Sequence, residues 1–105
     1  MHYTSTHQFA SKIRRLSQRM LLLAKQRNWN AVSELESERQ IAITALFAHP
    51  KIKEELSDIS TILQEVIDID RESLLLGEHE QNNNSRQMSG LHKTKHAVFS
   101  YLDNS

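Results

Sequence analysis

The sequence contains no cysteine, one proline and two glycines among its 105 residues. The absence of cysteine excludes disulfides, thiolate metal sites and a thiol nucleophile. Few glycines and prolines leave little material for the tight turns that join strands, whereas residues that favour helices are plentiful. The composition therefore predicts an all-α protein.

Long hydrophobic runs are also absent. The longest uninterrupted apolar run covers residues 20–24, whereas a membrane-spanning helix needs about 20 residues. The opening stretch MHYTSTHQFASKIRR has no apolar segment of the kind found in signal peptides. We therefore expect a soluble, intracellular protein with no membrane insertion, folded as one domain over residues 1–105.

Acidic residues are missing from the first third of the chain. Residues 1–33 carry six Lys or Arg and no Asp or Glu, whereas residues 34–80 carry twelve acidic residues and four basic ones. The acidic part cancels the long-range field that phosphate binding requires, so we expect no nucleic-acid binding. The simpler interpretation is that the basic helix packs against the acidic ones.

Apolar residues recur at intervals of three and four along most of the chain, which is typical of amphipathic helices. The spacing predicts helices over 7–27, 31–48, 51–80 and 91–102. We expect an antiparallel helical bundle of three to four helices with a long third helix. In the segment RNWN, we expect Asn28 to end the first helix in the left-handed conformation and Asn30 to cap the second.

Two charged residues interrupt the apolar stripes of the second and third helices. Arg39 occupies an apolar position, and we expect its methylenes to lie on the core edge with the head group in water. Glu36 or Glu38 could pair with it there. Asp70 is the first charged residue on the inner stripe of the third helix.

The third helix is expected to be longer than its neighbours. At 1.5 Å per residue it spans roughly 45 Å, against roughly 30 Å for the first helix. Leu74, Leu75 and Leu76 lie on the part that should overhang. We expect them to be covered by the last helix, a second subunit or a client.

The sequence offers no set of residues suited to catalysis. His92 and His96 have the spacing of metal ligands, but no third ligand is close to them in sequence. Residues 78–80 are a run of Glu, His and Glu whose side chains point in different directions on a helix. We therefore expect no enzymatic activity, no bound metal and no cofactor.

The remaining functional signal is apolar surface in excess of what short helices bury. Such a surface suits a protein that accepts an amphipathic helix from a partner. The residues expected to bind the partner are Ile43, Leu46, Phe47, Leu63, Val66, Leu74 and Leu75. The alternative is a structural or regulatory helical dimer that has no secretion client and uses its apolar faces internally.

A pattern in the first half of the chain is similar to that of a known family. The pattern comprises Leu16-Ser17, Met20-Leu21, Ala24, Trp29, Val32, Leu35-Glu36, Arg39, Ile43 and Leu46. It resembles the FliT family of flagellar export chaperones, in which a leucine-rich helix leads through a short turn to a Trp. A second helix with a Leu-Glu step and a following basic residue comes next. The family often has Gly and Asp around the Trp, where this chain has Asn28 and Asn30.

The resemblance implies a four-helix, cytoplasmic, non-enzymatic chaperone. Such a protein binds the flagellar filament-capping protein before export and delivers it to the export ATPase complex. In parts of the family it also inhibits the master transcription regulator of flagellar genes, and the last helix can lie over the client-binding surface. The implied role of Trp29 is to wedge the corner between the first two helices and close that end of the bundle. A homodimer stays open as an alternative.

Overall fold

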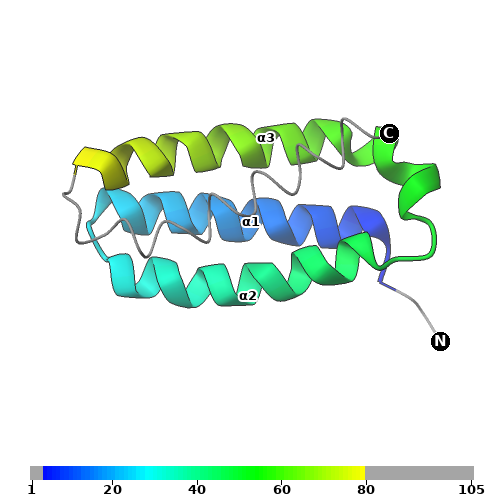
Figure 1. Cartoon of the computed structure of the whole chain (residues 1–105), viewed down its shortest axis with the longest axis horizontal. Coiled ribbons are helices and arrows are strands. Elements are labelled where there is room, and N and C mark those ends of the chain that lie inside the picture. The colour runs from blue at the N-terminus through cyan, green and yellow to red at the C-terminus, as the bar shows by residue number, and fades with distance from the viewer. Residues whose placement is uncertain (1–3, 80–105) are drawn as a thin grey trace.

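The computed structural model describes residues 4–79, and the predicted helix over 91–102 lies outside these residues. The described part comprises α1 (Thr6–Lys25), α2 (Trp29–Phe47) and α3 (Ile52–His79), with no strand among residues 4–79. The three helices lie side by side and run in alternating directions (Figure 1). The predicted all-α antiparallel bundle with a long third helix is confirmed. The three predicted spans agree with the observed ones to within two residues at each end.

Helix α1 is the central element of the bundle. It packs against both α2 and α3, whereas α2 and α3 approach each other much less closely. Ser5 caps its N-terminus by accepting from the Gln8 N–H, and the Gln8 side chain accepts from the Ser5 N–H in return. This reciprocal arrangement is a capping box, which satisfies two backbone donors that the helix itself leaves open.

The turn between α1 and α2 is a Schellman motif. Arg27 adopts the left-handed conformation, with φ at 61°. Its N–H donates to the Ala24 carbonyl at 3.0 Å, and the Asn28 N–H donates to the Leu23 carbonyl at 2.9 Å. These two bonds satisfy carbonyls that the end of α1 would otherwise leave without a donor.

Asn28 is also the N-cap of α2. Its side-chain oxygen accepts from the Ala31 N–H at 3.3 Å. The expected left-handed Asn28 and the expected N-cap at Asn30 are therefore wrong by one and two residues. The reason is that α1 ends earlier and α2 begins earlier than predicted, so Trp29 is already the first helical residue.

His49 organises the turn between α2 and α3. Its Nδ1 lies 3.1 Å from the Lys51 backbone nitrogen, and its Nε2 lies 3.1 Å from the Thr4 carbonyl oxygen. A backbone N–H can only donate and a carbonyl can only accept. These contacts use the lone pair of Nδ1 and a proton on Nε2, and they tie the start of the described chain to this turn.

The apolar core consists of two clusters of buried side chains. The first cluster, near the α2–α3 turn, contains Ala10, Ile13, Ala42, Ile43, Leu46, Ile52, Leu56, Ile59, Leu63, Val66 and Ile67. The second cluster, near the α1–α2 turn, contains Met20, Ala24, Trp29, Val32 and Leu74. Along each of α1 to α3 the residues of the two clusters are separated by buried polar positions, and on α3 these include Ser73. The positions that hydrogen bonds join to one another are Ser17, Arg39 and Asp70. We call these three residues the polar layer.

Leu74 to Leu76 are partly covered within the bundle. Leu74 belongs to the second cluster, and Leu76 packs against that cluster, but Leu75 is 53% exposed. The expectation that all three need an external cover is therefore wrong for Leu74. The physical reason is that the α1–α2 corner, including Trp29, reaches the last third of α3 and packs there.

Two ion pairs link the basic first helix to the acidic third one. Arg14 of α1 lies 3.4 Å from Glu65 of α3, and Lys25 lies 3.7 Å from Glu72. The interpretation that the basic helix packs against acidic neighbours is confirmed by these pairs. Both are partly exposed to solvent, so each contributes little to stability.

Candidate functional site

The most unusual buried side chain in the described structure is Arg39. Its relative exposure is 0%, and it is the largest of the fully buried side chains among the described residues. The expectation that its head group lies in water is therefore wrong. A buried cation is unfavourable unless acceptors surround it, so its neighbours explain how the fold accommodates it.

Three acceptors from all three helices surround the Arg39 guanidinium. Nη1 donates to Asp70 Oδ1 of α3 at 2.6 Å and to Ser17 Oγ of α1 at 2.7 Å, and Nη2 donates to Glu36 Oε2 of α2 at 2.8 Å. The prediction that Glu36 or Glu38 could pair with Arg39 is confirmed for Glu36. The planar fork of an arginine can reach several acceptors in fixed directions, which the single ammonium group of a lysine cannot.

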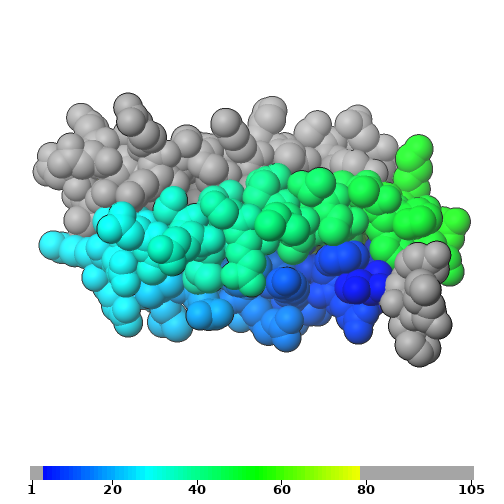
Figure 2. All heavy atoms as spheres, turned by 90° about the horizontal axis from the view of Figure 1, so that it is seen from below, coloured from blue at the N-terminus to red at the C-terminus, as the bar shows by residue number. Residues whose placement is uncertain are grey.

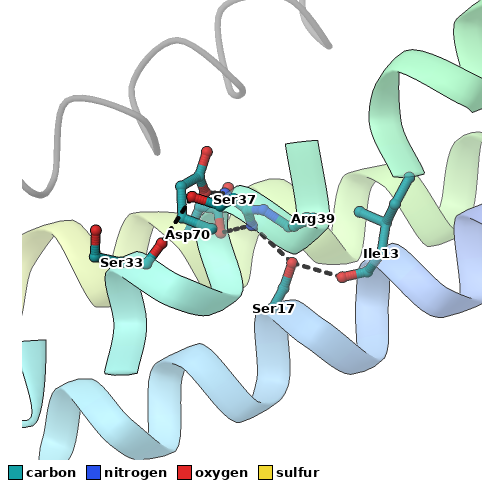
Figure 3. A network of polar contacts seen from close by, with 7 residues as sticks. Ile13, Ser17, Ser33, Ser37, Arg39 and Asp70 are labelled. Carbon is teal, nitrogen blue, oxygen red and sulfur yellow. Dashed lines mark hydrogen bonds and ion pairs between the residues drawn. The ribbon is translucent and has the colours of Figure 1, made fainter. Parts of the chain in front are cut away.

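The direction of the hydrogen bonds through Ser17 is fixed by its partners. Its hydroxyl lies 2.8 Å from the Ile13 carbonyl, which can only accept, so Ser17 donates its proton there (Figure 3). The oxygen is then left as an acceptor for the Arg39 N–H. Ser17 therefore connects the guanidinium to the backbone of α1 without any unused donor on the hydroxyl.

The sequence carried a signal for this contact. Arg39 and Asp70 each occupy a position where the spacing of their helix would otherwise place an apolar residue. Opposite charges at such positions on two helices of one small bundle favour a direct pair in the interior. The sequence shows each interruption separately, whereas their contact depends on how α2 and α3 pack.

The predicted partner-binding residues divide between the two ends of the bundle. Ile43, Leu46, Leu63 and Val66 are buried in the first cluster, and Phe47 packs against it while partly exposed. Leu74 and Leu75 lie beyond the polar layer, toward the α1–α2 corner. The structure thus brings the residues of the first cluster and Phe47 together, and it separates them from Leu74 and Leu75.

Trp29 lies at the corner between α1 and α2. Its side chain is 7% exposed and packs in the second cluster with Met20 and Ala24 of α1 and Leu74 of α3. The indole N–H finds no hydrogen-bond acceptor within residues 4–79. Its contribution at this corner is therefore apolar contact area, which large aromatic rings supply.

The outer face of α2 carries an exposed apolar side chain in a shallow hollow. Figure 2 looks onto this helix, with α1 beside it. Ile41 is 73% exposed, and the hollow around it is lined by Glu36, Ser37, Gln40, Thr44, Ala45 and Ala48. None of the residues predicted to bind the partner lines this hollow.

The described residues contain no cluster suited to hold a metal ion. No group of three or more His, Cys, Asp or Glu side chains comes together between residues 4 and 79. The pair His92 and His96 lies outside the described residues. None of helices α1 to α3 is both long and apolar enough to cross a membrane.

The described residues form a small antiparallel helical bundle. The sequence matches the family model described as "Flagellar protein FliT" over residues 10–103. The chain therefore belongs to the FliT family. No curated protein and no solved structure matches it.

Membership of this family implies the role of a flagellar export chaperone, which acts by binding and not by catalysis. Three residues of the pattern that resembles the family, Ser17, Glu36 and Arg39, meet in the polar contacts of the core. The resemblance noted in the sequence therefore includes residues that hold the three helices together.

Proposed function

We propose that the chain binds the C-terminal amphipathic region of the flagellar filament-capping protein and delivers it to the export ATPase complex. The observation that carries this proposal is the match to the FliT family over residues 10–103, nearly the whole chain. We also propose the cytoplasm as the place of action, and an inhibitory contact with the flagellar master transcription regulator as an additional role.

The predicted binding residues differ in how directly a client can reach them. Ile43, Leu46, Leu63 and Val66 are each at most 4% exposed. A client helix that contacts them has to displace the groups that cover them. Leu75 is the most accessible member of the set, and the partly exposed Phe47 is the next. Initial contact with a client is therefore expected at these two side chains.

Calorimetric titration of the full-length chain with a peptide from the C-terminal region of the capping protein tests the proposal. Leu75→Ala is expected to weaken binding by about tenfold, or about 1.4 kcal/mol, because the client would bury this exposed leucine and alanine supplies less apolar surface. The matched control is Ile41→Ala, which removes an even more exposed aliphatic side chain from the outer face of α2 and should leave the affinity unchanged.

The alternative of a structural or regulatory dimer without a client predicts a different result. In that case the peptide does not bind, and Leu75→Ala shifts the sedimentation behaviour of the chain toward a smaller species. An affinity that falls equally for Leu75→Ala and Ile41→Ala would contradict the predicted location of the binding surface.

A further inference from the structure

The polar layer divides the apolar stripes of α1, α2 and α3 at the same level of the bundle. On α1 it is Ser17, with Ile13 of the first cluster on one side and Met20 of the second on the other. On α2, Arg39 lies between Leu35 and Ala42 in the same way. On α3, Asp70 is preceded by Val66 and Ile67 and followed by Leu74.

The apolar stripes alone would allow more than one alignment of the helices. In the first cluster they consist of Ala, Val, Leu and Ile side chains at positions about one helical turn apart, whereas the second cluster also includes Met20 and Trp29. A helix that slides by one turn, about 5.4 Å, would again present aliphatic side chains to its neighbours. Patterns of this kind specify a core but distinguish poorly between neighbouring registers.

The buried charges make every shifted alignment unfavourable. If α3 slides by one turn relative to α2, Asp70 moves away from Arg39 and Val66 or Leu74 takes its place. Arg39 then keeps Glu36 of its own helix but loses the Asp70 carboxylate, and separating the two partners of a buried ion pair is strongly disfavoured. The same reasoning applies to α1, because a shift removes the Ser17 oxygen from Arg39 Nη1.

The layer matters most between α2 and α3. These two helices approach each other much less closely than either approaches α1, so backbone packing between them restrains their register weakly. The contact between Arg39 Nη1 and Asp70 Oδ1, at 2.6 Å, joins them directly, and both side chains are at most 2% exposed.

We propose that the polar layer of Ser17, Arg39 and Asp70 is a device that selects one register of the three helices, in particular of α2 against α3. A buried ion pair contributes little net stability compared with apolar residues of similar size, but a polar group at a core position can specify register. The layer therefore specifies one alignment of the helices without increasing the free energy of unfolding.

Spectroscopic distance measurement between two spin labels tests the register. The chain has no cysteine, so Glu38→Cys on α2 and Thr61→Cys on α3, both exposed positions, provide the only attachment sites. The parent is expected to give one narrow distance distribution. Arg39→Met with Asp70→Leu is expected to give a broadened or second distance, while the thermal midpoint stays equal to or above that of the parent.

A matched control uses one of the two ion pairs that join α1 and α3. Arg14→Gln with Glu65→Gln removes a partly exposed ion pair between α1 and α3 and should leave the narrow distance intact. Three results would overturn the proposal: an unchanged distance in the Met/Leu variant, equal broadening in the control, or unfolding of the Met/Leu variant. The last would show that the layer supplies stability and not register.

The register of α2 against α3 also sets where the predicted partner-binding residues of the two helices meet, and this consequence rests on the proposed function. If only about a tenth of the Met/Leu variant keeps the parent register, its affinity for the capping-protein peptide falls about tenfold. If the parent does not bind the peptide, the proposed function fails. The spin-label distances still decide the role of the polar layer in that case.

Discussion

Arg39 of α2 and Asp70 of α3 form a buried ion pair in which Nη1 and Oδ1 are 2.6 Å apart. The two residues are 31 positions apart in the sequence, and the backbones of their helices approach each other much less closely than either approaches α1. The pair lies between two apolar clusters, each of which takes residues from all three helices. One contact therefore determines how two separate parts of the core are aligned.

Removing only one member of this pair should destabilise the protein severely. Arg39→Met leaves the carboxylate of Asp70 in the interior without its cation, which costs about 3–5 kcal/mol of unfolding free energy. Urea denaturation followed by circular dichroism measures the loss. A loss below about 1 kcal/mol would mean that water or another group reaches Asp70 and that the layer is not dry.

Truncating the corner aromatic should leave a cavity in the second cluster. Trp29→Ala is expected to lower the unfolding free energy by about 3 kcal/mol or more, because the ring is buried against residues of α1 and α3. Trp29→Phe retains an aromatic ring at the corner and should cost clearly less. A melting temperature of the Ala variant within error of the parent would indicate that the ring contributes no packing.

Replacing the left-handed residue of the α1–α2 turn should stabilise the fold. Arg27 has φ at 61°, which costs roughly 1–2 kcal/mol for a residue with a Cβ, whereas glycine adopts it freely and loses only part of this gain through chain entropy. Arg27→Gly is therefore expected to raise stability by about 0.5–1 kcal/mol in thermal melting. Gln26→Gly, at a φ of −87°, is the control and should lower it.

Asn28 should be the residue whose side chain supports the start of α2. Asn28→Ala removes the acceptor for the Ala31 N–H and is expected to cost about 1 kcal/mol. Asn28→Ser keeps an N-cap oxygen and should recover most of that loss. If the Ala and Ser variants unfold at the same denaturant concentration, the cap contributes nothing and the Schellman bonds alone define the turn.

Most of the secondary structure could be predicted because its causes are local. The three-and-four spacing of apolar residues, the RNWN segment and the scarcity of glycine and proline already indicate three helices with ends correct to within two residues. The errors concern the turn itself, where a shift of one residue decides whether Arg27 or Asn28 takes the left-handed conformation. Local propensity differs too little between neighbouring residues to resolve such a shift.

The arrangement of the site could be predicted only in part. The sequence shows which residues of α2 and α3 are apolar, but burial of Ile43, Leu46, Leu63 and Val66 in one cluster depends on how the helices pack. The corner residue Trp29 was expected at the end of the bundle. Its contact with Leu74, which covers part of the supposed overhang, follows from the position of α3 and from no local signal.

The amino-acid sequence by itself determined that this chain is all-α, that its first helix is basic and meets acidic neighbours, and that it resembles the FliT family. These properties follow from composition and from spacings of three to four residues. Only the tertiary structure decided that Arg39 is fully buried and that Ser17, Glu36 and Asp70 surround it. The reason is that the stability of a buried charge depends on acceptors 22 and 31 residues away along the chain, which folding alone brings within hydrogen-bonding distance.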